Sequence, residues 1–257
     1  MAQVDPADPR PAFRQIADQL RDRILAGELR PGELLPSEAG LLKEFGASRS
    51  TVRHSIEVLK NEGLIETRQG RGAFVRTAHP RLRRLAPDRF ARRHRQAGMT
   101  PFTVDVGTDR AARLEVRQFA PTTASAEVAA RLGLSEGVQV LARHFRFHVD
   151  DRPVQLSTSY LPYSLVQGSP VEDPSREPWP GGTIAQLETV GIRVTTILEE
   201  VSTRLPLPAE ARDLKLKTGT PVLLLARTMF ADDTPVLVSD LVMAADQYTL
   251  SYRFPVD

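Results

Sequence analysis

The sequence contains no cysteine and one tryptophan among its 257 residues, and aromatic side chains make up 6% of it. The absence of cysteine excludes a disulfide framework, a thiolate metal site and a cysteine nucleophile. No run approaches the roughly 20 apolar residues that a membrane-spanning helix needs. The polar N-terminus carries Asp5 and Asp8, unlike the basic start and apolar core of a signal peptide. We therefore expect a cytoplasmic protein without a metal or other cofactor.

An excess of one charge sign is also missing, because 34 basic and 32 acidic residues give a formal net charge of +2. The charges are nevertheless unevenly distributed. Residues 77–98 contain seven arginines and one aspartate, whereas residues 99–257 contain 15 basic and 20 acidic side chains. The basic segment would attract a polyanion, and the acidic C-terminal region would repel one. The length is more than one core usually supports and predicts two domains.

Three helices are predicted in the N-terminal part of the chain. Apolar side chains recur at helical spacing after Pro11, which predicts the first helix. Ser37 is a suitable N-cap for a short second helix, and Gly46 can adopt the left-handed conformation that ends it. Ser48 then caps a third helix. Two short helices joined by a tight glycine turn are the helix-turn-helix arrangement.

The first turn of the third helix is polar and basic, and it carries Arg49, Ser50, Thr51 and Arg53. A recognition helix presents this turn to the major groove, where arginine pairs with guanine and hydroxyl groups contact phosphates or bases. Two short strands follow within residues 63–75, and a basic glycine-rich turn joins them, Arg68-Gln69-Gly70-Arg71-Gly72. A basic wing directly after a recognition helix predicts a winged helix-turn-helix domain that binds DNA.

Three stretches carry a family resemblance: Leu35-Pro36-Ser37-Glu38, Ser48-Arg49-Ser50-Thr51-Val52-Arg53, and Gly63-Leu64-Ile65 leading to the glycine-rich turn. In order and spacing they closely resemble the DNA-binding domain of the GntR family of bacterial regulators. The resemblance implies operator contacts from the start of the third helix and minor-groove contacts from the tip of the wing. That family often has an arginine where this chain has Ala39. The candidate DNA-binding residues are Ser37, Ser48, Arg49, Ser50, Thr51, Arg53, Arg68, Gln69, Gly70 and Arg71.

Residues 77–88 contain two prolines and no clear apolar period, which predicts an interdomain linker between a first domain at 1–76 and a second at 89–257. Arg81, Arg83 and Arg84 lie in this segment, and further arginines follow in a predicted helix that ends at Gly98. Two interpretations remain open: these arginines touch DNA phosphates outside the recognition site, or they belong to a solvated tether.

From about residue 99, extended segments alternate with a few helices. We expect strands at 102–110, 113–119, 138–149, 152–161, 193–204, 221–231 and 234–244, and helices at 124–132, 183–190 and 208–214. Aspartate-rich turns separate two pairs of these strands, as in β-hairpins: Asp150-Asp151-Arg152 and Asp232-Asp233-Thr234. Two hairpins combined with helices predict an antiparallel α+β domain.

A second resemblance rests on Pro153-Val154-Gln155-Leu156 to Tyr160-Leu161-Pro162, Gly219-Thr220-Pro221-Val222-Leu223, Pro235-Val236 and Ala245-Asp246-Gln247-Tyr248. This region resembles the UTRA effector domain of the HutC subfamily of GntR regulators, whose fold is similar to that of chorismate lyase. The resemblance implies a homodimeric repressor that a small metabolite releases from a palindromic operator. Three alternatives stay open: an activator, a repressor whose C-terminal domain only dimerises, and an enzyme. The last is not expected, because no serine elbow, phosphate loop or HExxH motif is present.

Sugar-phosphate sensors of this subfamily bind their ligand with polar side chains. At the corresponding positions this chain has less polar residues. Two strand arginines of those sensors fall on Phe145 and Phe147. Because a phosphate without arginines is poorly compensated for its desolvation, we expect a less charged, more hydrophobic effector. A phosphosugar held by Arg143 or Arg146 would overturn this expectation. The candidate effector-binding residues are Ala91, Phe145, Phe147, Ser157, Thr183, Ala185, Leu237 and Met243.

Two further features have alternative interpretations. His144, Arg146 and His148 alternate along a predicted strand and therefore share one face, which favours a solvent-facing or dimer-interface stripe over a metal site. Trp179 lies in a proline- and glycine-rich segment ahead of a predicted helix. It either lines a ligand pocket or pins the loop.

Overall fold

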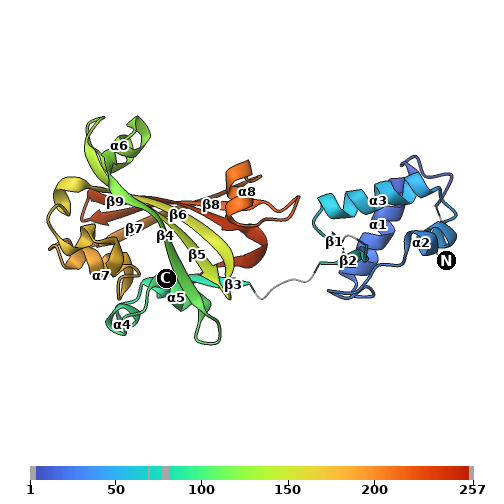
Figure 1. Ribbon diagram of the computed structural model, residues 1–257, viewed down its shortest axis with the longest axis horizontal. Coiled ribbons are helices and arrows are strands. Elements are labelled where there is room, and N and C mark those ends of the chain that lie inside the picture. The colour runs from blue at the N-terminus through green and yellow to red at the C-terminus, as the bar shows by residue number, and fades with distance from the viewer. Residues whose placement is uncertain (1–3, 69, 77–80, 255–257) are drawn as a thin grey trace. The chain divides into compact units, whose positions relative to one another are not determined.

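The computed structural model describes residues 4–68, 70–76 and 81–254. The chain divides into two compact units, the first holding the elements from α1 to β2 and the second those from β3 to β10 (Figure 1). Each unit has its own hydrophobic core. Within the part described, no helix is both long enough and apolar enough to cross a membrane.

The first unit consists of three helices and a two-stranded hairpin: α1 (Ala12–Leu25), α2 (Glu38–Phe45), α3 (Arg49–Asn61), β1 (Ile65–Arg68) and β2 (Gly72–Val75). Ser37 and Ser48 cap α2 and α3, because each hydroxyl accepts a hydrogen bond from a backbone N–H three residues further on. Gly46 ends α2 at a φ of 61°, in the left-handed region that favours glycine. The predicted winged helix-turn-helix is confirmed.

The second unit is built on a six-stranded antiparallel sheet with the order β4-β5-β6-β9-β8-β7. Its strands are β4 (Ala112–Thr123), β5 (Gln139–Val149), β6 (Arg152–Pro162), β7 (Thr196–Arg204), β8 (Val222–Ala231) and β9 (Thr234–Ala244). Asp150, Asp151 and Asp232 adopt positive φ in the turns between paired strands. Both predicted hairpins and the antiparallel α+β class are confirmed.

Short helices cover both faces of this sheet: α4 (Arg92–Gln96), α5 (Pro101–Val106), α6 (Ala126–Leu132), α7 (Gly182–Glu188) and α8 (Pro208–Asp213). Figure 1 shows α4, α5 and α7 on one side of the sheet and α6 and α8 on the other. Single 3-10 turns complete the unit: η1 (Asp88–Phe90), η2 (Tyr163–Leu165), η3 (Pro170–Glu172), η4 (Pro174–Arg176) and η5 (Ala245–Gln247).

The predicted linker is wrong over residues 82–86. These residues form β3 (Leu82–Ala86), which pairs in parallel with β10 (Tyr248–Tyr252). Leu82 is buried in the core of the second unit together with Tyr248. The basic segment therefore contributes a structural strand to the second unit, and residues 77–80 of the predicted linker lie outside the described residues.

The expected strand at 102–110 is also wrong, because residues 101–106 form helix α5. Thr100 and Thr103 make a reciprocal capping box at its start, and Pro101 occupies the first helical turn. Phe102 and Val106 are buried, and their spacing of four residues places them on one face of the helix. The helix predicted to end at Gly98 is present as α4, shorter than expected and preceded by η1.

Candidate functional site

Three hydroxyl groups gather at the start of α3. Ser48 Oγ lies 2.8 Å from both Ser50 Oγ and Thr51 Oγ1, and it accepts a hydrogen bond from the Thr51 backbone N–H at 3.2 Å. Arg49 is exposed beside them and makes no ion pair with the part of the chain that the structure describes. An exposed helix N-terminus attracts negative charge, and the hydroxyl and guanidinium groups beside it can donate hydrogen bonds. These properties suit binding to the phosphates and base edges of a nucleic acid.

Arg53 follows one turn later and is held by Glu38 on α2. Its Nε donates to both carboxylate oxygens of Glu38 at 3.1 Å, while the Arg53 side chain remains 62% exposed. Because this pair uses only Nε, the two terminal nitrogens have no partner among the described residues. They can therefore make the bidentate contact that arginine forms with a guanine edge.

The β1–β2 hairpin presents two more arginines. Arg68 donates to Glu66 at 2.9 Å, and its guanidinium lies 4.4 Å from the ring centroid of Phe74. Arg71 is exposed at the tip, beside Gly70 with a φ of 71°. Gln69 lies outside the described residues. Arg68 is thus fixed along the hairpin, whereas Arg71 is presented to solvent.

Ser37 serves α2 through its hydroxyl. Its Oγ accepts a hydrogen bond from the Gly40 backbone N–H at 3.1 Å, and the residue is exposed. The hydroxyl proton has no acceptor among the described residues and can be donated to a phosphate oxygen.

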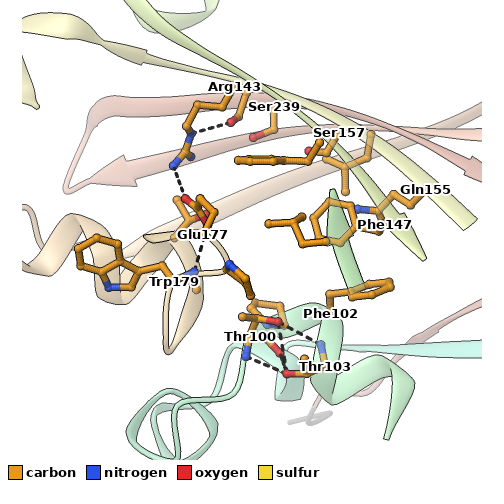
Figure 2. Close-up of a pocket in the computed structure, with 18 of the residues that line it drawn as sticks. Thr100, Phe102, Thr103, Arg143, Phe147, Gln155, Ser157, Glu177, Trp179 and Ser239 are labelled. Carbon is orange, nitrogen blue, oxygen red and sulfur yellow. Dashed lines mark hydrogen bonds and ion pairs between the residues drawn. The ribbon is translucent and has the colours of Figure 1, made fainter. Parts of the chain in front are cut away.

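A cavity lies against one face of the six-stranded sheet in the second unit (Figure 2). The cavity and its mouth together hold about 970 Å³ of space between the atoms, a volume that includes open solvent. Alternate residues of β5, β6, β8 and β9 line it, because side chains two apart on a strand share a face. The other walls come from η1, α5, β4, the start of α7 and the loop before α7. Apolar side chains dominate, including Phe90, Phe102, Phe145, Phe147, Trp179 and Ile184.

The structure brings five of the eight predicted effector-binding residues to this cavity: Phe145, Phe147, Ser157, Thr183 and Leu237. Met243 shares their face of the sheet but is fully buried one step further along β9, under Arg84. Ala185 lines a separate surface hollow with residues of α4. Ala91 is the N-cap of α4 and does not line the cavity. Trp179 lines the cavity wall. This position agrees with the first of its two interpretations, that of a residue lining a ligand pocket.

Arg143 is a cavity residue outside the predicted set. Its Nε donates to Ser159 Oγ at 3.1 Å and its Nη1 to Gln186 Oε1 at 2.6 Å. The carboxylate of Glu177 lies 3.6 Å from the same Nη1 (Figure 2). Burial lowers the pKa of Arg143 to about 10, although Glu177 acts in the opposite direction. Arg143 lies two residues before Phe145 and shares its face, so strand periodicity alone is enough to find it.

Further buried charges belong to ion pairs that include two more cavity residues, Arg89 and Arg227. Arg89 makes a bidentate pair with Asp105 at 3.0 and 2.6 Å. Arg227 on β8 donates to Glu199 on β7 at 2.6 Å, and Arg84 on β3 reaches the same carboxylate at 3.0 Å. Although burial opposes it, Arg227 and Arg84 lower the pKa of Glu199.

The interpretation of the basic segment needs correction for two of its arginines. Arg84 and Arg89 are 2% and 4% exposed and are engaged by carboxylates of their own unit. They are therefore unavailable to DNA phosphates and do not belong to a solvated tether. Arg81 and Arg83 remain exposed.

Comparisons with known proteins agree with both units. Residues 12–75 match the family described as bacterial regulatory proteins, gntR family, and residues 108–249 match the UTRA domain. The HTH-type transcriptional regulator SCO4628 of Streptomyces coelicolor is 32% identical over 97% of this chain and 95% of its own length. The chain belongs to the GntR family. As a GntR regulator with a UTRA domain, it is a transcriptional regulator and not an enzyme.

Other GntR-family members are similar along the whole chain. The transcriptional repressor NagR of Bacillus subtilis is 28% identical over 96% of both chains, and the histidine utilization repressor of Pseudomonas aeruginosa is 26% identical over 96% and 92%. A crystal structure described as a GntR-family transcriptional regulator has a TM-score of 0.72 and 31% identity, covering 96% of this chain and 99% of its own. PhnF from Mycobacterium smegmatis has a TM-score of 0.57 and 26% identity, covering 94% and 100%.

Proposed function

We propose that this GntR-family regulator is a homodimeric, cytoplasmic repressor that leaves a palindromic operator when a small molecule fills the cavity. The observation that carries the proposal is the combination, in one chain, of an exposed basic start of α3 and a mainly apolar cavity in the second unit. Similarity to proteins named as repressors along 96% of this chain supports the direction of control.

In this proposal the start of α3 enters the major groove and the tip of the β1–β2 hairpin enters the minor groove. Arg49 and Arg53 read base edges, and the hydroxyls of Ser48 and Ser50 contact neighbouring phosphates. Two copies present two α3 helices to half-sites one helical turn apart, so the operator mirrors the symmetry of the dimer.

The effector is less charged and more hydrophobic than a sugar phosphate. Phe145 and Phe147 on the cavity face of β5 support this proposal, because their rings offer an apolar surface and no hydrogen-bond donor for a phosphate. The effector acts by binding the released geometry of the dimer more tightly than the operator-bound geometry. This difference in affinity sets the size of the switch.

The test begins with selection of duplexes from fragmented genomic DNA by the purified protein. The expected product is a short palindrome whose binding is weakened by Arg49→Ala but not by Arg212→Ala, an exposed arginine of the second unit. Fractionated metabolites are then screened for release of that duplex. No enrichment of any duplex contradicts the DNA-binding proposal, and enrichment without release by any fraction contradicts the sensor proposal.

A further inference from the structure

Seven buried ionised side chains line the cavity or belong to the ion pairs behind its wall, and their charges do not cancel. Four are arginines and three are carboxylates: Arg84, Arg89, Arg143, Arg227, Asp105, Glu177 and Glu199. None of these side chains is more than 11% exposed. One positive charge is therefore left over at the cavity wall. Arg113 also lines the mouth, but its side chain is half exposed and water solvates it.

The surplus arises because Arg84 and Arg227 share the carboxylate of Glu199, and the guanidinium groups of Arg227 and Arg89 lie near the same aromatic ring. Arg89 and Arg227 both line the cavity, and they stand 5.0 and 5.3 Å from the ring centroid of Phe90. Arg89 donates hydrogen bonds from Nε and Nη2 to Asp105, and Arg227 donates from the same two nitrogens to Glu199. Their Nη1 atoms have no hydrogen-bond partner among the described residues, and that of Arg89 is buried.

A buried charge without a partner is costly, because the protein interior solvates an ion far less well than water. Burial already lowers the pKa of Arg227 to about 10, even though Glu199 raises it. A ligand with one negative charge would neutralise the excess and accept hydrogen bonds from the free nitrogens. A dianion would bring one charge more than this wall can balance.

We infer that the effector is an amphipathic monoanion whose carboxylate pairs with Arg89 and Arg227 while an aromatic or branched aliphatic body packs on the phenylalanines of the cavity. This inference rests on the proposed function, which makes the cavity the effector site. It extends the expectation of a hydrophobic effector by assigning the molecule one charge and a place for that charge.

The probes are 3-phenylpropanoate and its neutral isostere 3-phenylpropanamide. Trp179 is the single tryptophan of the chain and lines the cavity, so its fluorescence reports occupancy directly. For the unmodified protein we expect the carboxylate to bind at least about tenfold more tightly than the amide, as charge-assisted hydrogen bonds require. Equal affinities, or no binding of either probe at millimolar concentration, would overturn the inference.

Two variants remove the surplus charge, Arg89→Met and Arg227→Met. Each is expected to abolish the preference for the carboxylate, whereas Arg113→Met at the mouth keeps it. Glu177→Gln acts in the opposite direction, because it raises the surplus to two charges. We expect it to strengthen carboxylate binding several-fold without a matching gain for the amide. Damage to the fold cannot strengthen binding of the carboxylate probe. The result for Glu177→Gln therefore tests the inference even if the arginine variants unfold.

Operator release is scored separately from probe binding. If the preference for the carboxylate follows the arginines but no metabolite releases the operator, the sensor proposal fails and the anion site stands. If metabolites release the operator while the amide binds as tightly as the carboxylate, the sensor stands and the inference of an anionic effector fails. Retention of the preference in both arginine variants likewise overturns the assignment to Arg89 and Arg227.

Discussion

Replacement of Arg53 by alanine separates a DNA contact from a structural role. The side chain is 62% exposed, and Glu38 is its ion-pair partner. Loss of an exposed pair costs about 0.2–1 kcal/mol of unfolding free energy. Loss of a bidentate base contact costs about 1–3 kcal/mol of binding free energy, or roughly 5- to 150-fold in Kd. We therefore expect Arg53→Ala to bind the selected operator much more weakly while it unfolds almost as the unmodified protein does.

The assay is fluorescence anisotropy with the operator and with a random duplex, alongside urea unfolding. Arg23→Ala is the matched control, because Arg23 pairs with Glu44 between α1 and α2 at 2.9 Å and lies outside α3. It should lose similar stability and little operator affinity. Equal losses of operator affinity in Arg53→Ala and Arg23→Ala would refute the reasoning, as would an Arg53→Ala loss of the same size on the random duplex.

Two further predictions concern single side chains. Ser48→Ala removes the cap of α3 and should lower the unfolding free energy by about 1 kcal/mol with weaker operator binding, and an unchanged melting temperature would contradict it. Although burial opposes it, hydrogen bonds from Arg146, Arg117 and His148 lower the pKa of Glu115 from 4.5 to about 2. This stabilisation is complete above pH 4.5 and disappears as the pH falls towards 2. Glu115→Gln should therefore lower the unfolding free energy by only about 1 kcal/mol at pH 7, because water screens these ion pairs, and by progressively less in acid. A loss that does not change with pH in urea unfolding would contradict this prediction.

The first unit could be predicted closely because its signals are local. Ser37, Gly46 and Ser48 mark helix boundaries through hydrogen bonds and dihedral angles that involve only near neighbours in the sequence. In the second unit the hairpins were predictable for the same reason, since Asp150 and Asp232 occupy tight turns. Local chemistry thus determines these elements before any tertiary contact forms.

The errors arise where partners are distant in sequence. β3 was missed because it pairs with β10, and Arg83 meets Ser251 across 168 positions. The alternation of Phe102, Val104 and Val106 fits a strand as well as a helix, and the capping box at Thr100 decides for the helix.

The cavity was only half predictable for a related reason. The strand residues follow from periodicity, whereas the charged wall depends on long-range pairs such as Arg84 with Glu199, 115 residues apart. The carboxylate partners of this basic segment lie on strands far along the chain. The local sequence therefore predicts a solvated segment, although two of its arginines are buried in ion pairs. The sequence therefore indicated the floor of the cavity but not its charge.

The central claim is that the start of α3 lies in a DNA groove, and the absence of cysteine allows a direct measurement. A DNA-cleaving reagent is attached to the thiol of Ser50→Cys, and in a parallel sample to Lys60→Cys at the far end of the same helix. The account predicts that the Ser50→Cys conjugate cuts the selected operator at two symmetry-related sites, one in each half-site, and that the Lys60→Cys conjugate cuts weakly. Equal cutting by both conjugates, or cutting spread evenly along the duplex, would contradict it.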